Sequence, residues 1–362
     1  HRDLHLSIRR QRQMCIRDRR KCLLWLTRPW QKNLLKGMNT FIRLIKCIEN
    51  IFFCDRGLES LISNNLSAEA QHVLAKANYP LKSRSFEKLA ALRNETRKAI
   101  TPAVERVLEM YEASIETREI SGVSCVLVKP SQIKVNWKIF YGYGGGYVSG
   151  SPFEDLTIAV PLAIETGAAV VIPDYRLAPE SPWPAAIDDG FNVFQGMSGE
   201  PLAFVGESAG GNLCLTLMLR AKELGIPLPR AAAFLSPWCD LTNSGDSVIN
   251  NDGRDPALSA QHINFAANCY VGEHEPTDPM ISPINGMFDK SFPPSIITTG
   301  SRDLLMSQAI QLRDTLKDNK VPVELCVWED LWHVFEWDYR LPESLRSIRQ
   351  ISNWLHRYMP NF

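Results

Sequence analysis

The stretch Leu-Ala-Phe-Val-Gly-Glu-Ser-Ala-Gly-Gly-Asn-Leu at residues 202–213 constrains the fold more than any other part of the chain. A short apolar run, typical of a buried strand, leads into a Gly-x-Ser-x-Gly turn around Ser208, and apolar residues at helical spacing follow. Strand, tight turn and helix in this order indicate a nucleophile elbow. Glycines at 206 and 210 remove the side chains that would collide in so sharp a reversal. We therefore predict that Ser208 lies at a helix N-terminus, where free N–H groups and the helix dipole favour a developing anion.

A glycine-rich loop, Gly142-Tyr143-Gly144-Gly145-Gly146-Tyr147, follows an apolar strand predicted at residues 137–141. A dinucleotide-binding Gly-x-Gly-x-x-Gly pattern would need glycine where Tyr147 stands, and no Gly-Lys-Ser/Thr of a phosphate-binding loop follows. The remaining use is an oxyanion hole, in which backbone N–H groups of a loop without side chains approach developing negative charge. The loop precedes the elbow on an earlier strand, which is where a serine hydrolase of this type carries that element.

A serine hydroxyl needs a base to accept its proton, and the pKa of histidine suits that role near neutrality. Among the seven histidines, only His333 lies in a loop behind a late strand, predicted at residues 323–327, and after a candidate acid. The chain order Ser–Asp–His of this elbow requires that arrangement. The other histidines lie in the basic N-terminal stretch, in predicted helices or in a Pro- and acid-rich loop: His1, His5, His72, His262, His274 and His356.

The acid that orients the histidine is predicted to be Asp303, which follows a strand at residues 295–299. A carboxylate at the start of a helix, facing the dipole, is the alternative explanation of Asp303. Three further carboxylates lie near late strands and are rivals: Asp240, Asp330 and Asp338. The spacing from Ser208 through Asp303 to His333 favours Asp303.

Taken together, these motifs resemble the hormone-sensitive-lipase-like esterases over roughly residues 120–360. The residues that carry the resemblance are the glycine loop continued to Ser151, the elbow, Asp-Tyr-Arg-Leu-Ala-Pro-Glu at 174–180, Ser-Pro-Trp-Cys-Asp-Leu-Thr at 236–242, Gly-Ser-Arg-Asp-Leu-Leu at 300–305 and Trp-His-Val-Phe at 332–335. The resemblance implies an α/β-hydrolase fold, with a mostly parallel eight-stranded sheet flanked by helices and a helical cap. It also implies hydrolysis of short- and medium-chain carboxylic esters without a metal or other cofactor.

By position, the resemblance implies that the oxyanion donors are the backbone amides of Gly145, Gly146 and Ala209. The chain departs from the family where Tyr143 replaces the usual His before the three glycines, and where Glu207 replaces the usual Asp before the nucleophile. We expect the Tyr143 hydroxyl to anchor the loop and Glu207 to be structural. The segment 174–180 is expected to be scaffold, and four aromatic residues are candidates to line the pocket: Tyr147, Trp238, Phe265 and Trp332.

The net charge of zero hides two unlike parts of the chain. Residues 1–36 contain eleven Lys or Arg and two Asp, a net charge of +9, so the remaining residues carry −9. Residues 1–37 fit a basic transit peptide, a nucleic-acid-binding arm or a non-native stretch. The string Met-Cys-Ile-Arg-Asp-Arg at residues 14–19 resembles the translation of a sequencing-library adapter. We therefore favour the non-native interpretation, with Met38 as the native start and no nucleic-acid partner.

Residues 38–120 contain few strand signals and are predicted to form N-terminal helices that contribute to the cap. An apolar stripe at residues 41–53 is expected to pack against the body or the cap, with a membrane-surface helix as the alternative. One further helix is predicted over residues 86–92, and another over residues 102–115, with Pro102 inside its first turn.

Residues 121–362 are predicted to form the catalytic domain, with a cap insertion at about 243–292. Scattered cysteines without a Cys-x-x-Cys pair favour a reduced, cytoplasmic compartment over disulfides or a zinc site. No apolar run reaches the roughly 18 residues of a membrane span, so no stable membrane insertion is expected.

The predicted function is that of a serine carboxylesterase that acts on a small-molecule ester. A lactone hydrolase or an amidase would use the same residues and stays an alternative. A non-catalytic receptor of the same fold is a further alternative, although the presence of Ser208, Asp303 and His333 opposes it. The resemblance alone implies a homodimer.

Overall fold

The computed structural model describes residues 66–77, 85 and 88–359, and the account that follows concerns these residues. The basic stretch at residues 1–37, the expected start at Met38 and the apolar stripe at 41–53 lie outside them. Within the described ranges, no helix is both long enough and apolar enough to cross a bilayer.

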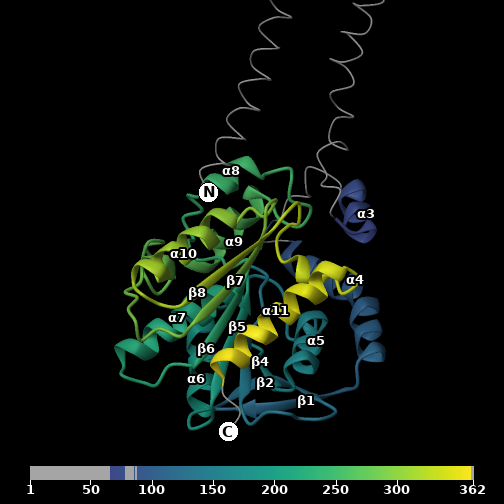
Figure 1. The fold of residues 1–362 in the computed structure, drawn as a ribbon. Coiled ribbons are helices and arrows are strands. Elements are labelled where there is room, and N and C mark those ends of the chain that lie inside the picture. The colour runs from purple at the N-terminus through teal and green to yellow at the C-terminus, as the bar shows by residue number, and fades with distance from the viewer. Residues whose placement is uncertain (1–65, 78–84, 86–87, 360–362) are drawn as a thin grey trace, which may run out of the picture. The chain divides into compact units, whose positions relative to one another are not determined.

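An eight-stranded sheet forms the centre of the described chain (Figure 1). Its spatial order is β1-β2-β4-β3-β5-β6-β7-β8, in which β2 runs antiparallel to both of its neighbours and the other pairs are parallel. The bounds of the strands are β1 Ala113–Ile120, β2 Val123–Pro130, β3 Lys138–Gly142, β4 Ala169–Pro173, β5 Leu202–Glu207, β6 Ala231–Leu235, β7 Ser295–Gly300 and β8 Val323–Trp328. The mostly parallel eight-stranded sheet expected from the sequence is confirmed.

Helices cover both faces of this sheet, which is why its central strands are continuous apolar runs (Figure 1). On one face lie α5 (Leu156–Thr166) and α11 (Pro342–Tyr358), and on the other lie α6 (Ala185–Gly196), α7 (Ala209–Glu223) and α10 (Met306–Asp318). The remaining helices are α3 Ala68–Lys76, α4 Leu89–Met110, α8 Asp246–Asn250 and α9 Ala260–Val271, with short 3₁₀ helices η4 Pro283–Asn285 and η5 Phe335–Trp337.

The parallel strands bring four distant loops to one edge of the sheet. The glycine loop follows β3, the elbow follows β5, and the loops with Asp303 and His333 follow β7 and β8. The register pairs Gly142 with Gly206 and Gly300 with Trp328, so neighbouring strands end side by side. Loops at the carboxyl ends of adjacent parallel strands therefore converge, which is where open α/β sheets bind ligands.

Residues 38–120 are not all helical, so that prediction is wrong for its last part. Residues 113–120 form β1, which pairs with β2 through the two-residue turn Ser121-Gly122. Both turn residues have positive φ, 50° and 81°, as a type I′ hairpin turn requires. Most residues of β1 are exposed, and Ala113 and Ile120 at its two ends pack against the core, so backbone pairing with β2 holds much of this edge strand. Val123–Pro130 is consequently the second strand of the described chain.

The helix predicted from Pro102 begins earlier and ends earlier than expected. Pro102 lies in the interior of α4, which starts at Leu89 and ends at Met110. Thr101 does not cap a helix start, since its hydroxyl donates to the carbonyl of Arg97 at 2.7 Å within the same helix. A Thr-Pro pair therefore does not mark the start of a helix where packing of the apolar face maintains the helix through the proline.

The close packing of the elbow against the glycine loop makes Gly210 intolerant of any side chain. A Cβ at Gly210 would lie 2.0 Å from the carbonyl oxygen of Gly142. We expect Gly210→Ala to lower the free energy of unfolding by about 1–3 kcal/mol or more, measured by urea denaturation. Gly211→Ala is the matched control, because its Cβ would meet Pro237 Cβ at 3.0 Å, Pro237 Cα at 3.2 Å and the Gly206 carbonyl oxygen at 3.4 Å, all much longer than the contact at Gly210. Equal stability of the two variants would contradict the packing argument.

Candidate active site

Ser208 occupies the sharp turn between β5 and α7. Its backbone has φ 51° and ψ −119°, a positive φ that a non-glycine residue rarely adopts. Hydrogen bonds hold this conformation, because the Ser208 N–H donates to the Leu235 carbonyl at 2.9 Å and its carbonyl accepts from Trp238 N at 3.0 Å. The hydroxyl therefore lies at the N-terminus of α7, as the sequence predicts.

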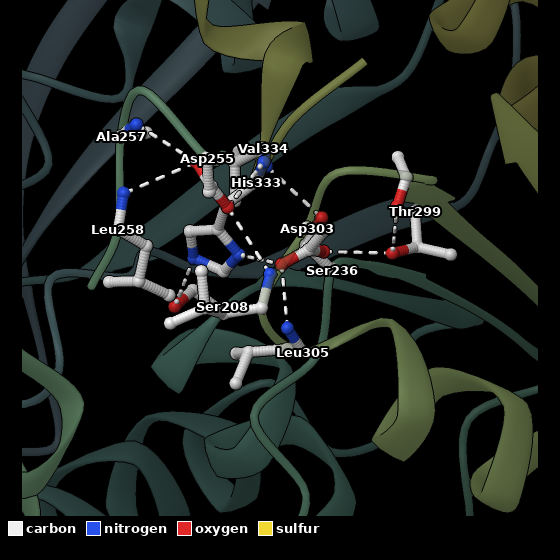
Figure 2. A network of polar contacts seen from close by, with 12 residues as sticks. Ser208, Ser236, Asp255, Ala257, Leu258, Thr299, Asp303, Leu305, His333 and Val334 are labelled. Atoms are coloured by element: carbon white, nitrogen blue, oxygen red, sulfur yellow. Dashed lines mark hydrogen bonds and ion pairs between the residues drawn. The ribbon is translucent and has the colours of Figure 1, made fainter. Parts of the chain in front are cut away.

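Ser208, His333 and Asp303 form one hydrogen-bonded chain (Figure 2). Ser208 Oγ lies 3.0 Å from His333 Nε2, and His333 Nδ1 lies 2.9 Å from Asp303 Oδ1. All three residues are buried, with Asp303 fully so. The structure thus brings together the three residues that were singled out from different parts of the sequence.

The charge distribution around His333 favours an ionised acid and a more basic imidazole. Burial opposes ionisation of Asp303, but the attraction of His333 and hydrogen bonds outweigh it and lower the pKa of the carboxyl. Burial also opposes protonation of His333, but Asp303 in particular raises the pKa of the imidazole above its usual value. Hydrogen bonds from Leu305 N and Thr299 Oγ1, both at 2.8 Å, orient the two oxygens of Asp303.

The glycine loop presents backbone donors beside Ser208. Gly145 and Gly146 have φ values of 101° and 65°, so the loop conformation depends on glycine at both positions. Within the part of the chain that the structure describes, the backbone N–H groups of Gly145, Gly146 and Ala209 donate to no protein acceptor. Gly145 and Gly146 line the same cavity as Ser208, and Ala209 directly follows Ser208 at the start of α7.

A cavity of about 670 Å³ opens over these residues, a volume in the range of small-molecule sites. Its floor includes Ser208, His333 and the glycines of the loop. Its walls come from α4 and from the insertion after β6, with Ile100, Ala103, Leu258, Ile263 and Ala266 among the apolar contributors. Of the four aromatic candidates, Trp238 and Trp332 line the cavity. Tyr147 and Phe265 are not part of the lining, and Tyr147 instead donates its hydroxyl to Asn212 at 2.8 Å.

Comparisons with known proteins agree with this architecture. A family model described as the alpha/beta hydrolase fold matches residues 139–337, more than half of the chain. The chain belongs to the α/β-hydrolase family. It is similar to an acetyl-hydrolase of Streptomyces hygroscopicus, with 32% identity over 58% of this chain and 72% of that protein. It is also similar to an esterase of Acinetobacter venetianus, with 27% identity over 71% of this chain and 88% of that protein.

Solved structures of this family give the same result. An esterase from the bacterial hormone-sensitive lipase family superposes with a TM-score of 0.71 and 27% identity, covering 81% of this α/β hydrolase and 99% of that chain. The resemblance to hormone-sensitive-lipase-like esterases that the sequence motifs indicate is therefore confirmed.

Tyr143, one departure from the family pattern, anchors the glycine loop of this hydrolase. The Tyr143 hydroxyl donates to the Tyr175 carbonyl at 3.2 Å, and the Tyr175 hydroxyl donates to the Tyr143 carbonyl at 2.6 Å. The two rings stack with centroids 4.1 Å apart. The segment 174–180 consequently supports the loop, which agrees with its expected role as scaffold.

Glu207, the other departure, lies buried behind the loop. Its Oε1 accepts a hydrogen bond from the backbone N–H of Gly144. Burial and the neighbouring Asp155 raise the pKa of the Glu207 carboxyl well above its usual value, and the two carboxyls share a hydrogen bond. Asp155 in turn accepts from Tyr141 and Trp337 at 3.0 and 2.9 Å. The hydrogen bond from Gly144 makes Glu207 a structural support of the glycine loop, as expected.

The rival acids have other partners in this hydrolase. Asp240 accepts hydrogen bonds from Thr242 and Ser244 and closes a local turn. Asp330 pairs with Arg302 at 3.0 Å, and Asp338 pairs with Arg340 at 2.6 Å. The carboxylate that the structure places at the His333 ring is that of Asp303.

Sequence reasoning missed Asp255, a fully buried carboxylate that contacts the same two loops. It accepts a hydrogen bond from the backbone N–H of His333 at 3.2 Å (Figure 2). Ser236 was also missed, and its hydroxyl accepts from Val334 N at 3.0 Å. No sequence signal distinguishes Asp255 from other loop carboxylates, because its role depends on contacts between segments that are distant in the chain.

Proposed function

We propose that this hydrolase is a serine carboxylesterase that cleaves short- to medium-chain carboxylic esters through an acyl-enzyme intermediate. The observation that carries the proposal is the chain of contacts from Ser208 Oγ to His333 Nε2 and from His333 Nδ1 to Asp303, with distances of 3.0 and 2.9 Å. The esterase and acetyl-hydrolase relatives support the choice of a carboxylic ester as substrate.

In the first half of the reaction, Ser208 Oγ attacks the ester carbonyl while His333 Nε2 accepts its proton. The carbonyl oxygen becomes an oxyanion, for which the backbone N–H groups of Gly145, Gly146 and Ala209 are the donors. Each such donor typically contributes about 3 kcal/mol to barrier lowering. The imidazolium then gives the proton to the leaving alcohol, and the acyl group stays on Ser208.

In the second half, a water molecule takes the place of the alcohol. His333 accepts a proton from this water, the hydroxide attacks the acyl carbonyl, and the returning proton restores Ser208 as the acid leaves. Asp303 holds Nδ1–H of the imidazole throughout and stabilises its positive charge. The mechanism uses only side chains and amides of this chain.

We also propose that α4 and the insertion at 243–292 together form the cap over the acyl pocket. Residues of both line the cavity. Arg93 of α4 fastens this helix to the glycine loop, since its Nε donates to the Val148 carbonyl at 2.8 Å. On the other side, Tyr270 of α9 stacks on Tyr147 with centroids 3.8 Å apart. The cap and the loop that would bind the oxyanion are thus in direct contact.

A panel of p-nitrophenyl esters from acetate to palmitate tests the proposed activity. We expect turnover to be highest with short or medium acyl chains, since the cavity of about 670 Å³ has walls on both sides. Phenylmethylsulfonyl fluoride, which modifies activated serines, should abolish turnover. Lactones and amides are run in parallel. Faster hydrolysis of either than of every ester would replace the carboxylesterase assignment, and a folded protein inactive on all three classes would reject the mechanism.

The pH profile of the esterase should follow the titration of His333. Only the neutral imidazole accepts a proton, so kcat/KM should fall about tenfold per pH unit below the pKa of His333. Because Asp303 raises that pKa above its usual value of 6.5, the midpoint of the acid limb should lie above 6.5. Asp303 stays ionised across this range because its own pKa is lowered. Initial rates with p-nitrophenyl acetate give the midpoint, and a value below 6.5 would contradict the electrostatic argument.

A further inference from the structure

Asp255 is a buried acid that the proposed mechanism leaves without a role. It lies in the insertion between α8 and α9, and its exposed fraction is 0%. A buried carboxylate carries a large desolvation cost unless hydrogen bonds compensate for it. The contacts that Asp255 makes therefore indicate what it does.

The two oxygens of Asp255 contact different parts of the site (Figure 2). Oδ1 accepts from the backbone N–H groups of Ala257 and Leu258, at 2.8 and 3.2 Å, and so holds the carboxylate within its own segment. Oδ2 accepts from the backbone N–H groups of Leu304 and His333, both at 3.2 Å. A single oxygen thus bridges the loop after β7 to the loop after β8.

These two loops carry the acid and the base of the proposed triad. Leu304 directly follows Asp303, so the contact at its N–H fixes the backbone next to the acid. The other contact is to the backbone of His333 itself. Building on the proposed esterase function, we propose that Asp255 is a positioning residue: its carboxylate, supplied by the cap insertion, holds the loops of Asp303 and His333 at the separation that their hydrogen bond requires.

Besides its hydrogen bonds, the negative charge of Asp255 also affects His333. Burial and the nearby Asp303 raise the pKa of Asp255 to about 7, although the attraction of His333 opposes this rise. As an anion, Asp255 adds to Asp303 in raising the pKa of His333. The charged groups that face His333 are Asp303 from the loop after β7, Asp255 from the insertion and Glu336 from η5. Removal of the Asp255 charge should therefore lower the pKa of the imidazole.

The test compares Asp255→Asn with Asp252→Asn in the full chain. The first variant removes the charge and turns an amide NH₂ toward N–H donors, because Asn offers only one acceptor oxygen. The control removes an exposed carboxylate three residues earlier, whose Oδ1 accepts a hydrogen bond from Ala260 N at 3.2 Å. We measure kcat and KM for p-nitrophenyl acetate against pH, and we count reactive Ser208 by titrating a separate sample with phenylmethylsulfonyl fluoride, so that rates refer to folded sites.

For Asp255→Asn we expect kcat to fall by about 10–100-fold with KM within about twofold, as a displaced base and acid would produce. The midpoint of the acid limb should move to lower pH, which a purely structural role would not cause. Asp252→Asn should change neither quantity. Wild-type kcat and an unmoved midpoint in Asp255→Asn would overturn the proposal, as would equal losses in both variants. Absence of turnover in the wild-type protein would instead reject the esterase function itself.

Asp255→Thr is a second variant in case the first does not fold. The Thr hydroxyl oxygen is one bond closer to the backbone than the carboxylate oxygens and carries no charge, so kcat should fall as in Asp255→Asn, with the midpoint again lowered.

Discussion

Ser208→Ala should reduce kcat for p-nitrophenyl esters by about 10⁴–10⁶-fold, the largest effect expected of any substitution in this protein. The variant loses the only atom that forms the acyl-enzyme, whereas the donors at Gly145, Gly146 and Ala209 remain. KM should change little, because the Ser208 side chain contributes little to the walls of the cavity. Residual turnover should be insensitive to phenylmethylsulfonyl fluoride.

Stability measurements separate loss of chemistry from loss of fold in this variant. Ser208 adopts a strained φ of 51° that Ala would share, so the urea midpoint should change little. A folded Ser208→Ala protein with full esterase activity would show that the elbow is not the site of reaction. Equal inactivation of both proteins by the sulfonyl fluoride would lead to the same conclusion.

Asp303→Asn should lower kcat by about 10³–10⁴-fold, the second largest effect. Leu305 N donates to Oδ1, so the amide oxygen of Asn should occupy that position and still accept from His333 Nδ1–H. The NH₂ group would then face Thr299, whose hydroxyl can rotate to accept. The tautomer of His333 is therefore kept, and the loss comes from the missing negative charge that stabilises the imidazolium.

The pH profile distinguishes this explanation from a change of tautomer. Without the Asp303 charge, the pKa of His333 should fall, so the acid limb of kcat/KM should move to lower pH while the plateau drops. Asp240→Asn is the matched control, because it removes a buried carboxylate bonded only to Thr242 and Ser244 among the contacts of the described residues. Asp240→Asn should keep kcat per reactive serine. A loss of kcat comparable to that of Asp303→Asn would mean that neutralising any buried carboxylate at this end of the sheet lowers activity.

The parts of the fold that the sequence predicts well are those where burial dictates the residue pattern. The strand predicted at 137–141 is β3, Lys138–Gly142, and the strand predicted at 295–299 is β7, Ser295–Gly300. Parallel strands covered on both faces must be continuous apolar runs, and such runs are visible in a single sequence. The same logic placed Ser208, Asp303 and His333 directly behind strands.

Elements that form only by pairing with other segments are harder to predict from the sequence. The polar segment 113–120 becomes β1 only because the turn at Ser121-Gly122 folds it against β2. That two-residue turn was a signal for a hairpin, and it was missed because the strand before it has no alternating apolar face. Asp255 is a stronger case, because its partners lie 49 and 78 residues away in the chain. No local pattern encodes such a contact.

The contacts between the glycine loop and its surroundings bear on how new substrate ranges could arise in this hydrolase. Ala266 of α9 lies 2.9 Å from the position of a Cβ on Gly146, and Arg93 of α4 binds the carbonyl of Val148. A recombinant in which only the insertion at 243–292 is exchanged for that of a relative would therefore inherit a mismatched loop. Exchange of the insertion together with α4 and residues 143–150 moves a self-consistent unit, and such blocks are the natural crossover units for chimeric esterases.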